Sequence, residues 1–198
     1  MPALAVLAQR RSDGQVRVQT RDALTGDLVG NFLLGSGWRP IEMQAVPDMD
    51  GNGVDDIATL LERKTDGLMV VQIRDATDGS LLSRVYPAGR GLKDWRVVQF
   101  RHLTFGGASA LAIAYVRRED GQVMVRTQDA ASGAVLKKVL FKPPPWELQA
   151  HFEVIPDFTG NGEPELAVPM RNATDARRIV QIRDAASGAV IRNITLPR

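Results

Sequence analysis

An acidic segment at residues 48–56 carries the residue types that bind a hard metal cation. It reads Asp-Met-Asp-Gly-Asn-Gly-Val-Asp-Asp, so oxygen-bearing side chains stand at its first, third, fifth and ninth positions. The main-chain carbonyl of its seventh residue adds a further oxygen, and Ca²⁺ takes about six to eight such ligands. The two glycines let the backbone fold closely around an ion. The sequence therefore predicts a Ca²⁺ site with the ligands Asp48, Asp50, Asn52, Val54 and Asp56.

A second segment, residues 157–165, repeats this pattern with weaker ligands. Threonine replaces the second carboxylate, and a longer glutamate stands at the ninth position, so we expect weaker binding by Asp157, Thr159, Asn161, Glu163 and Glu165. Neither segment is an EF-hand, since Thr59 occupies the twelfth place of the first one and no flank is helical. The alternative is a pair of acidic turns that bind nothing and only reverse the chain.

One sequence unit occurs four times, and this unit must position the acidic segments. Val-Gln-Thr-Arg-Asp-Ala begins at residue 18, and related sequences begin at residues 71, 125 and 180, at offsets of 53, 54 and 55 residues. A glycine stands three residues after each Asp-Ala pair. Tryptophans fall at equivalent places between the copies: Trp38, Trp95 and Trp146. These coincident markers indicate a repeat architecture.

Each unit is expected to form strands. Residues 16–20 and 70–74 are rich in β-branched side chains, and the Asp-Ala-x-x-Gly segment favours a turn. Four short strands per unit of about 50 residues are typical of a β-propeller blade, whereas the coils of a β-solenoid, the second choice, are shorter. We therefore expect an all-β propeller of four repeat units, at residues 1–37, 38–94, 95–145 and 146–198.

The first of these units contains only the last three strands of a blade. The 198 residues then form a single β-propeller domain or a propeller segment. Three alternatives stay open at this point. The chain is part of a longer array, a trimmed four-bladed ring, or one part of an oligomeric ring.

The acidic loop that leads into Ile57-Ala58-Thr59-Leu60, repeated at blade spacing, resembles the FG-GAP or VCBS-type repeats of integrin α chains and of many bacterial surface or secreted proteins. In the third unit the aligned residues are His102, Thr104, Gly106 and Ala110, so the site is lost there. The resemblance implies a Ca²⁺-stabilised propeller module that acts as a scaffold or binds a partner. It also implies an extracellular or cell-surface location, as part of a longer secreted protein.

Composition excludes several other classes of protein. The chain has no cysteine and two histidines, which excludes disulfides and thiol chemistry. Its formal net charge of +2 comes from interspersed charges, so we expect no nucleic-acid partner. The longest apolar run, residues 110–116, is too short for membrane insertion. A protein or glycan partner is compatible with these features, as is a homo-oligomer if one chain does not close the ring.

Other repeated residues have a structural explanation as well as a functional one. The tryptophans are expected to pack between blades rather than to stack on sugars. The turn aspartates Asp22, Asp75, Asp129 and Asp184 are expected to bond to the backbone. We therefore expect no catalytic residues and no enzyme activity. The alternative is a lectin for anionic polysaccharides or part of a polysaccharide lyase, with ligands held by the basic pairs Arg10-Arg11, Arg63-Lys64, Arg117-Arg118 and Arg177-Arg178.

Overall fold

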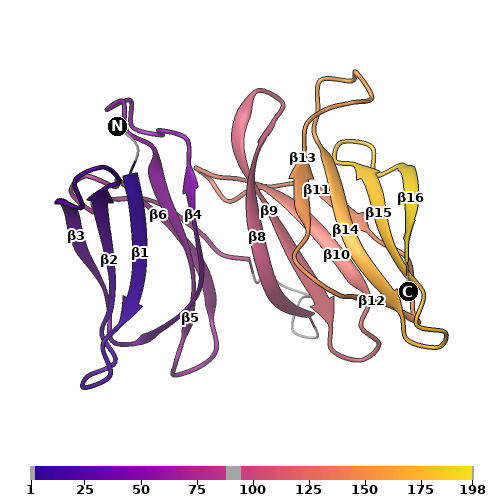
Figure 1. Cartoon of the computed structure of the whole chain (residues 1–198), viewed down its shortest axis with the longest axis horizontal. Helices are drawn as coiled ribbons and strands as arrows, with labels where there is room; N and C mark the ends of the chain where they lie inside the picture. The colour runs from indigo at the N-terminus through magenta and orange to yellow at the C-terminus, as the bar shows by residue number, and fades with distance from the viewer. Residues whose placement is uncertain (1–2, 88–94, 198) are drawn as a thin grey trace. The chain divides into compact units, whose positions relative to one another are not determined.

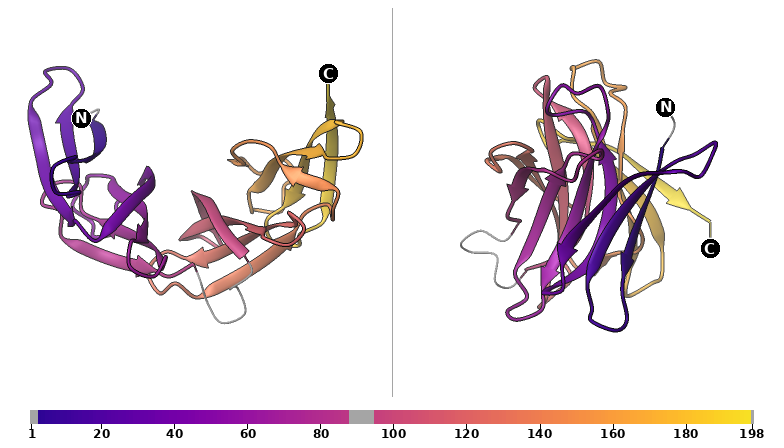
Figure 2. Two further views of the ribbon diagram at one scale, coloured as in Figure 1. Left: turned by 90° about the horizontal axis from the view of Figure 1, so that it is seen from below. Right: turned by 90° about the vertical axis from the view of Figure 1, so that its left-hand side faces the viewer.

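The computed structural model describes residues 3–87 and 95–197, and this part of the chain forms sixteen strands in four antiparallel sheets without any helix (Figure 1). The chain divides into two compact units, Met1–Pro87 and Ala88–Arg198. The strands within the sheets are twisted rather than flat, as the two views of Figure 2 show. The expected all-β class is confirmed.

The first unit contains two sheets. Sheet 1 has three strands in sequence order: β1 (Ala3–Gln9), β2 (Val16–Asp22) and β3 (Leu28–Gly35). Sheet 2 has four strands in sequence order: β4 (Trp38–Val46), β5 (Asp56–Arg63), β6 (Met69–Arg74) and β7 (Leu81–Val85).

The second unit also contains two sheets. Sheet 3 has four strands in sequence order: β8 (Trp95–Phe105), β9 (Ala108–Arg117), β10 (Val123–Asp129) and β11 (Val135–Leu140). Sheet 4 has five: β12 (Trp146–Leu148), β13 (Glu153–Ile155), β14 (Glu165–Asn172), β15 (Arg178–Asp184) and β16 (Val190–Leu196). Both β12 and β13 pair with β14, so together they take the place of one first strand.

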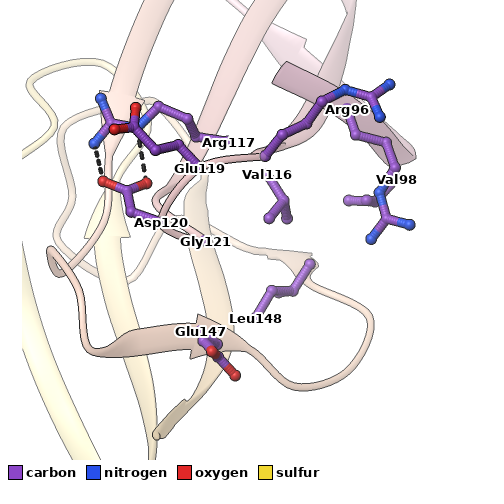
Figure 3. A pocket seen from close by; sticks show the side chains of 10 residues that line it. Arg96, Val98, Val116, Arg117, Glu119, Asp120, Gly121, Glu147 and Leu148 are labelled. Carbon is purple, nitrogen blue, oxygen red and sulfur yellow. Dashed lines mark hydrogen bonds and ion pairs between the residues drawn. The ribbon is translucent and has the colours of Figure 1, made fainter. Parts of the chain in front are cut away.

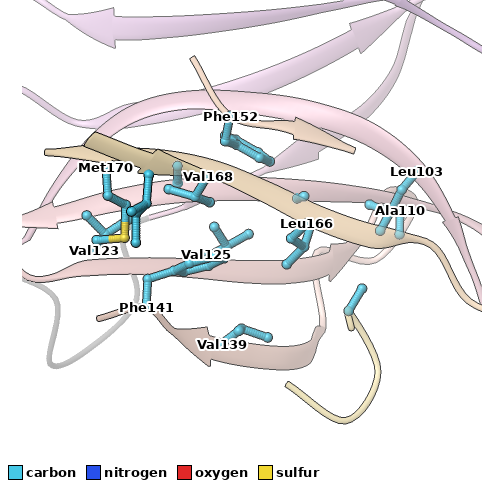
Figure 4. Close-up of a cluster of buried hydrophobic side chains, with 14 residues drawn as sticks. Leu103, Ala110, Val123, Val125, Val139, Phe141, Phe152, Leu166, Val168 and Met170 are labelled. Carbon is cyan, nitrogen blue, oxygen red and sulfur yellow. The ribbon is translucent and has the colours of Figure 1, made fainter. Parts of the chain in front are cut away.

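The second strand of each four-stranded sheet is buried on both of its faces. The first six residues of β5 are all buried, and so are six consecutive residues of β9. Such strands need continuous apolar runs instead of strict alternation, which explains the Ile-Ala-Thr-Leu and Leu-Ala-Ile-Ala segments. In the second unit, β9 contributes to a cluster of apolar side chains shared by sheets 3 and 4. Phe152, Leu166 and Met170 are fully buried in this cluster (Figure 4).

The sheets of the first unit pack through a turn glycine. Gly79 lies in the β6–β7 turn with a φ of 78°, and a Cβ atom placed there would lie 2.4 Å from Phe32 of β3. Only glycine combines this left-handed backbone with so close an approach. The contact joins sheet 1 to sheet 2 within the unit.

The Asp-Ala-x-x-Gly turn is built in the same way each time it occurs. One carboxylate oxygen of the aspartate accepts main-chain N–H bonds from inside the turn, as Asp22 does from Leu24 (2.7 Å) and Thr25 (2.9 Å). The residue before the aspartate donates its side chain to the glycine carbonyl: an arginine in three of the turns, at 2.6 Å for Arg74 and Gly79, and Gln128 in the fourth, at 2.9 Å from Gly133. The backbone-bonding role predicted for the repeated aspartates is therefore confirmed at Asp22, Asp75, Asp129 and Asp184.

Candidate metal-binding loops

The two acidic segments occupy the same place in their sheets. Residues 48–56 connect β4 to β5, and residues 157–165 connect β13 to β14. In the first loop Gly51 and Gly53 have φ values of 82° and 83°, and no atom lies within 4 Å of the position of an added Cβ at either one. The left-handed backbone, rather than crowding, is what requires glycine there.

The first aspartate of each loop organises the loop backbone. Asp48 accepts N–H bonds from Gly51 and Gly53, both at 2.7 Å. These bonds, the one from Gly53 above all, lower the pKa of Asp48. Asp157 accepts equivalent bonds from Gly160 and Gly162, also at 2.7 Å, and its pKa is lowered for the same reason. Both loops therefore hold an ionised carboxylate at their first position.

Asp56, at the ninth position of the first loop, is the most unusual group of the site. It is 0% exposed; its Oδ2 accepts the N–H of Met49 at 2.8 Å, and its Oδ1 has no hydrogen-bond partner. Burial raises its pKa to about 6, and the charges of Asp50, Asp75 and Asp48 add to the effect. A buried carboxylate oxygen without a partner is unfavourable unless a positive charge compensates for it.

Asp50 shares this acidic environment. Burial raises its pKa, and the charges of Asp48 and Asp75 act in the same direction. Its Oδ1 accepts the N–H of Asn52 at 3.1 Å. The loop thus gathers carboxylates that repel one another in the ionised state.

The ninth position of the second loop is occupied differently. Glu165 is also 0% exposed, but both of its carboxylate oxygens accept N–H bonds, from Phe158 and from Thr159 at 3.3 Å. Glu163 turns its side chain toward sheet 3, where Oε1 accepts the N–H of Gly106 at 2.7 Å, while Oε2 is buried without a partner. Thr159 donates its hydroxyl to Asp157 at 3.2 Å.

Sequence reasoning missed a link between each loop and the turn aspartate of its sheet. Asn52 donates its side-chain amide to Asp75 Oδ2 at 2.9 Å, and Asn161 donates to Asp184 in the same way. One oxygen of each aspartate thus serves the turn and the other holds the loop. One feature of the sequence could have revealed this link. In both repeat units the Asp stands 23 residues after the Asn.

The donor set of the first loop fits a hard cation only when all its oxygens are counted. Among the residues that the structure describes, no three His, Cys, Asp or Glu side chains lie close enough together to hold a metal ion by themselves. A cation in this loop would therefore also need the amide oxygen of Asn52 and the carbonyl of Val54, beside the carboxylates of Asp48, Asp50 and Asp56. An all-oxygen set of this kind suits Ca²⁺, and the unpartnered Oδ1 of Asp56 is the oxygen that still needs a positive charge.

The basic pairs are less available to bind an anionic ligand than the sequence indicates. The first arginine of three pairs forms an ion pair with an aspartate three residues later in its own hairpin. The pairs are Arg10–Asp13, Arg63–Asp66 and Arg117–Asp120. Each of these arginines therefore closes its own turn.

A cavity of about 680 Å³ lies in the second unit between the start of β8, the β9–β10 hairpin and β12 (Figure 3). Its wall includes the apolar side chains of Val98, Val116 and Leu148. Charges of both signs surround them, from Arg96, Arg117, Arg118, Glu119, Asp120 and Glu147. The cavity therefore offers apolar contact together with donors and acceptors.

The tryptophans that the structure describes are packing residues. Trp38 is partly buried against the apolar cluster of the first unit, and Trp146 against that of the second. The ammonium group of Lys142 lies 4.8 Å from the centre of the Trp146 ring. The side chain of Trp95 lies outside the described residues.

No protein-family model matches the chain, and no curated protein sequence matches it. Over 98% of its length it is similar to the structure of the Dos1 propeller, with a TM-score of 0.57 and 13% identity. It is also similar over 98% of its length to the rhamnogalacturonan lyase PL11 of Bacillus licheniformis, with a TM-score of 0.60 and 15% identity. The chain spans 45% of the first protein and 48% of the second. These likenesses show a propeller-like fold, and the FG-GAP or VCBS repeat type stays a prediction.

Within the described part of the chain, no helix has the length and apolar character needed to cross a membrane.

Proposed function

We propose that the chain is a Ca²⁺-stabilised β-propeller repeat module that acts as a binding or structural scaffold of a surface or secreted protein. The observation that carries the proposal is the buried Oδ1 of Asp56, which has no hydrogen-bond partner and lies in a loop of carboxylates. Ca²⁺ would neutralise these groups. It would be held by Asp48, Asp50, Asn52, Val54 and Asp56.

The role proposed for the ion is structural. Asp56 begins β5, and its carboxylate already holds the N–H of Met49 at the other end of the loop. Asn52 ties the same loop to the β6–β7 turn through Asp75. An ion bound to these residues would join two connections of sheet 2, the β4–β5 loop and the β6–β7 turn. The second loop, at residues 157–165, is proposed as a weaker site, because main-chain donors already satisfy Glu165.

We further propose that the module has no catalytic activity of its own. The repeated aspartates cap turns, and the hairpin arginines form ion pairs in their own turns. These repeated aspartates and arginines thus have structural tasks. A protein or glycan would be the natural partner, and an extracellular location would keep even a weak Ca²⁺ site occupied.

Thermal unfolding with and without Ca²⁺ tests the metal site. Ca²⁺ that binds only the folded chain stabilises it by about 3 kcal/mol at a hundredfold excess over the dissociation constant. We expect a higher Tm in Ca²⁺ than in chelator, and a much smaller difference in Asp50→Ala, where only the weaker second loop is left intact. The matched control is Asp55→Asn, an exposed neighbour outside the ligand set, which should keep the response. An equal Tm in Ca²⁺ and chelator for the wild-type chain would refute the site.

The cavity beside the β9–β10 hairpin favours a second candidate function. Arg96 and Arg118 at its wall would pair with carboxylates, and the apolar wall would contact sugar rings. A polysaccharide lyase is among the proteins of similar fold. In this case the chain would be an anionic-polysaccharide lectin or part of a lyase. Glycan-array binding without turnover would favour the lectin, and a rise in ultraviolet absorbance with an anionic polysaccharide would favour the lyase.

A further inference from the structure

The β6–β7 turn of sheet 2 is bonded to the first acidic loop. Asp75 begins this turn and is 6% exposed. Its Oδ1 accepts the N–H and the hydroxyl of Thr77, both at 2.6 Å, and its Oδ2 accepts the side-chain amide of Asn52 at 2.9 Å. The position of Asn52, a ligand of the proposed Ca²⁺ site, therefore depends on the position of this turn.

Sheet 1 packs against the same turn. The hydroxyl of Thr20 in β2 donates to the carbonyl of Ala76 at 3.0 Å, and both residues are buried. In β3, a Cβ atom added at Gly30 would lie 2.6 Å from that carbonyl oxygen, so the backbone of β3 touches the turn. Together with the contact between Phe32 and Gly79, these interactions hold the turn from sheet 1.

The second unit has a threonine at the equivalent place but not the same bond. Thr127 of β10 corresponds to Thr20, since each stands two residues before the aspartate of its own turn. Thr127 is 1% exposed, and within the part of the chain that the structure describes its Oγ1 has no hydrogen-bond partner. The bond from Thr20 is therefore a particular feature of the first unit and not a consequence of the repeat.

Support of this kind affects the affinity of a metal site through preorganisation. A site whose ligands are already held in place does not have to order them when the ion binds, so less of the binding free energy is lost. If the turn were released from sheet 1, Asp75 and Asn52 would be less fixed, and Ca²⁺ binding would have to order them again. A support that consists of one hydrogen bond changes such an equilibrium by about two- to tenfold.

We propose that Thr20 is a positioning residue for the Ca²⁺ site in residues 48–56, although it belongs to a different sheet. Its bond to Ala76 fixes the turn whose Asp75 holds Asn52. The inference rests on the proposed Ca²⁺ binding and adds a residue that controls its affinity. Because coupling between two equilibria is reciprocal, Ca²⁺ also strengthens the packing of sheet 1 on sheet 2.

Calorimetric titration with Ca²⁺ tests the inference on the intact chain. An Asp157→Ala background removes the first carboxylate of the second loop, so that the first loop dominates the titration. In this background Thr20→Val keeps the shape of the side chain but loses the hydroxyl, and we expect the Kd for Ca²⁺ to rise about two- to tenfold. Thr20→Ser keeps the hydroxyl and should therefore retain the original Kd.

The matched control is Thr127→Val, which removes a similarly buried hydroxyl that has no partner in the described part of the chain. It should leave the Kd of the first loop unchanged. All variants are compared at a temperature well below Tm, with circular dichroism to confirm that they are folded. A purely structural role of Thr20 would lower the Tm of Thr20→Val without any change in Kd, so Kd is the readout that separates positioning from stability.

Hydrogen exchange tests the reciprocal effect without any substitution in sheet 1. In the Asp157→Ala background, saturating Ca²⁺ should slow the exchange of amides in β2 and β3 about two- to tenfold more than in β9 and β10 of the second unit. In Thr20→Val this additional slowing in sheet 1 should disappear. The amides of β5, which begins at the ligand Asp56, should still be slowed by Ca²⁺ in that variant.

Failure of the inference and failure of the proposed function give different results. If the first loop does not bind Ca²⁺ at all, the proposed function is refuted and the inference with it. If Ca²⁺ binds with the same Kd whether residue 20 is threonine or valine, the inference alone is refuted. An equal rise in Kd for Thr20→Val and Thr127→Val, or no additional slowing in β2 and β3, would refute it as well. A rise in Kd confined to Thr20→Val, together with slower exchange in sheet 1, supports it.

Discussion

Two glycines in equivalent turns allow the packing of sheet 1 on sheet 2 to be measured directly. Gly26 and Gly79 have φ values of 77° and 78°, so alanine suffers the same backbone strain at both positions. No atom lies within 4 Å of a Cβ added at Gly26, whereas Phe32 lies 2.4 Å from one added at Gly79. The difference between Gly26→Ala and Gly79→Ala therefore isolates the contact with Phe32.

The expected loss of stability has two contributions, the strained backbone of the turn and the clash with Phe32. A left-handed backbone costs a non-glycine residue about 1–2 kcal/mol, which is the whole effect expected for Gly26→Ala. Overpacking adds about 1–3 kcal/mol, because Phe32 is 8% exposed and must be displaced. We therefore expect Gly79→Ala to lower the free energy of unfolding by about 2–5 kcal/mol.

Urea unfolding followed by circular dichroism measures both variants, with hydrogen exchange in β2 and β3 to show that the first unit is the part affected. In a Phe32→Ala background the added cost of Gly79→Ala should fall toward that of Gly26→Ala, because the clashing ring is gone. Equal losses for Gly26→Ala and Gly79→Ala in the wild-type background would show that the contact between Phe32 and the turn is not formed in solution.

Two further predictions concern the aspartates. Asp75→Ala should destabilise the chain by about 1 kcal/mol more than Asp22→Ala and weaken its Ca²⁺ response, since Asn52 loses its partner; equal losses in urea unfolding would contradict the link. The Arg63 bond lowers the pKa of Asp66 to about 2, so the stability from this ion pair is present above pH 4 and lost as the pH falls through about 2. An NMR titration checks this, and Arg63→Ala should return the pKa toward its usual value.

The strands and turns were largely predictable because the repeat shows the same local chemistry four times. The Asp-Ala-x-x-Gly turn was identified from residue types alone, and the structure places the carboxylate of Asp22 on the N–H groups of Leu24 and Thr25. The lack of a first strand in sheet 1 also followed from counting strands per unit. Local hydrogen bonding and strand spacing are properties that short stretches of sequence carry.

Contacts between distant residues were not predictable in the same way. The bond from Asn52 to Asp75 joins two segments that only the pairing of β5 with β6 brings together. The ion pairs of Arg63 and Arg117 depend on the conformation of a hairpin. From the sequence alone, these basic residues therefore appeared more available to an anionic ligand than they are. Burial of Asp56 likewise depends on the sheet around it and not on its neighbours in sequence.

A buried acid at the ninth position of a loop has two possible roles, to close the loop by binding main-chain N–H groups or to bind a cation. The two loops allow these roles to be distinguished. Asp56 and Glu165 are buried there, and both hold main-chain N–H groups of their loops, whereas Ala110 stands at this place in sheet 3. If loop closure were the only task, an amide would serve as well as an acid in both loops. Asp56, however, retains an unpartnered Oδ1, whereas both oxygens of Glu165 are occupied.

The two isosteric substitutions should therefore differ in their effect on Ca²⁺ binding. Asp56→Asn keeps the carbonyl oxygen that accepts the N–H of Met49 but removes the charge, so it should abolish most of the rise in Tm with Ca²⁺. Glu165→Gln should leave most of that rise in place, because its loop is the weaker site. Calorimetric titration with Ca²⁺ measures both affinities on the folded variants. If Asp56→Asn binds Ca²⁺ as tightly as the wild-type chain, the unpartnered oxygen is not a ligand and loop closure alone explains the buried acid.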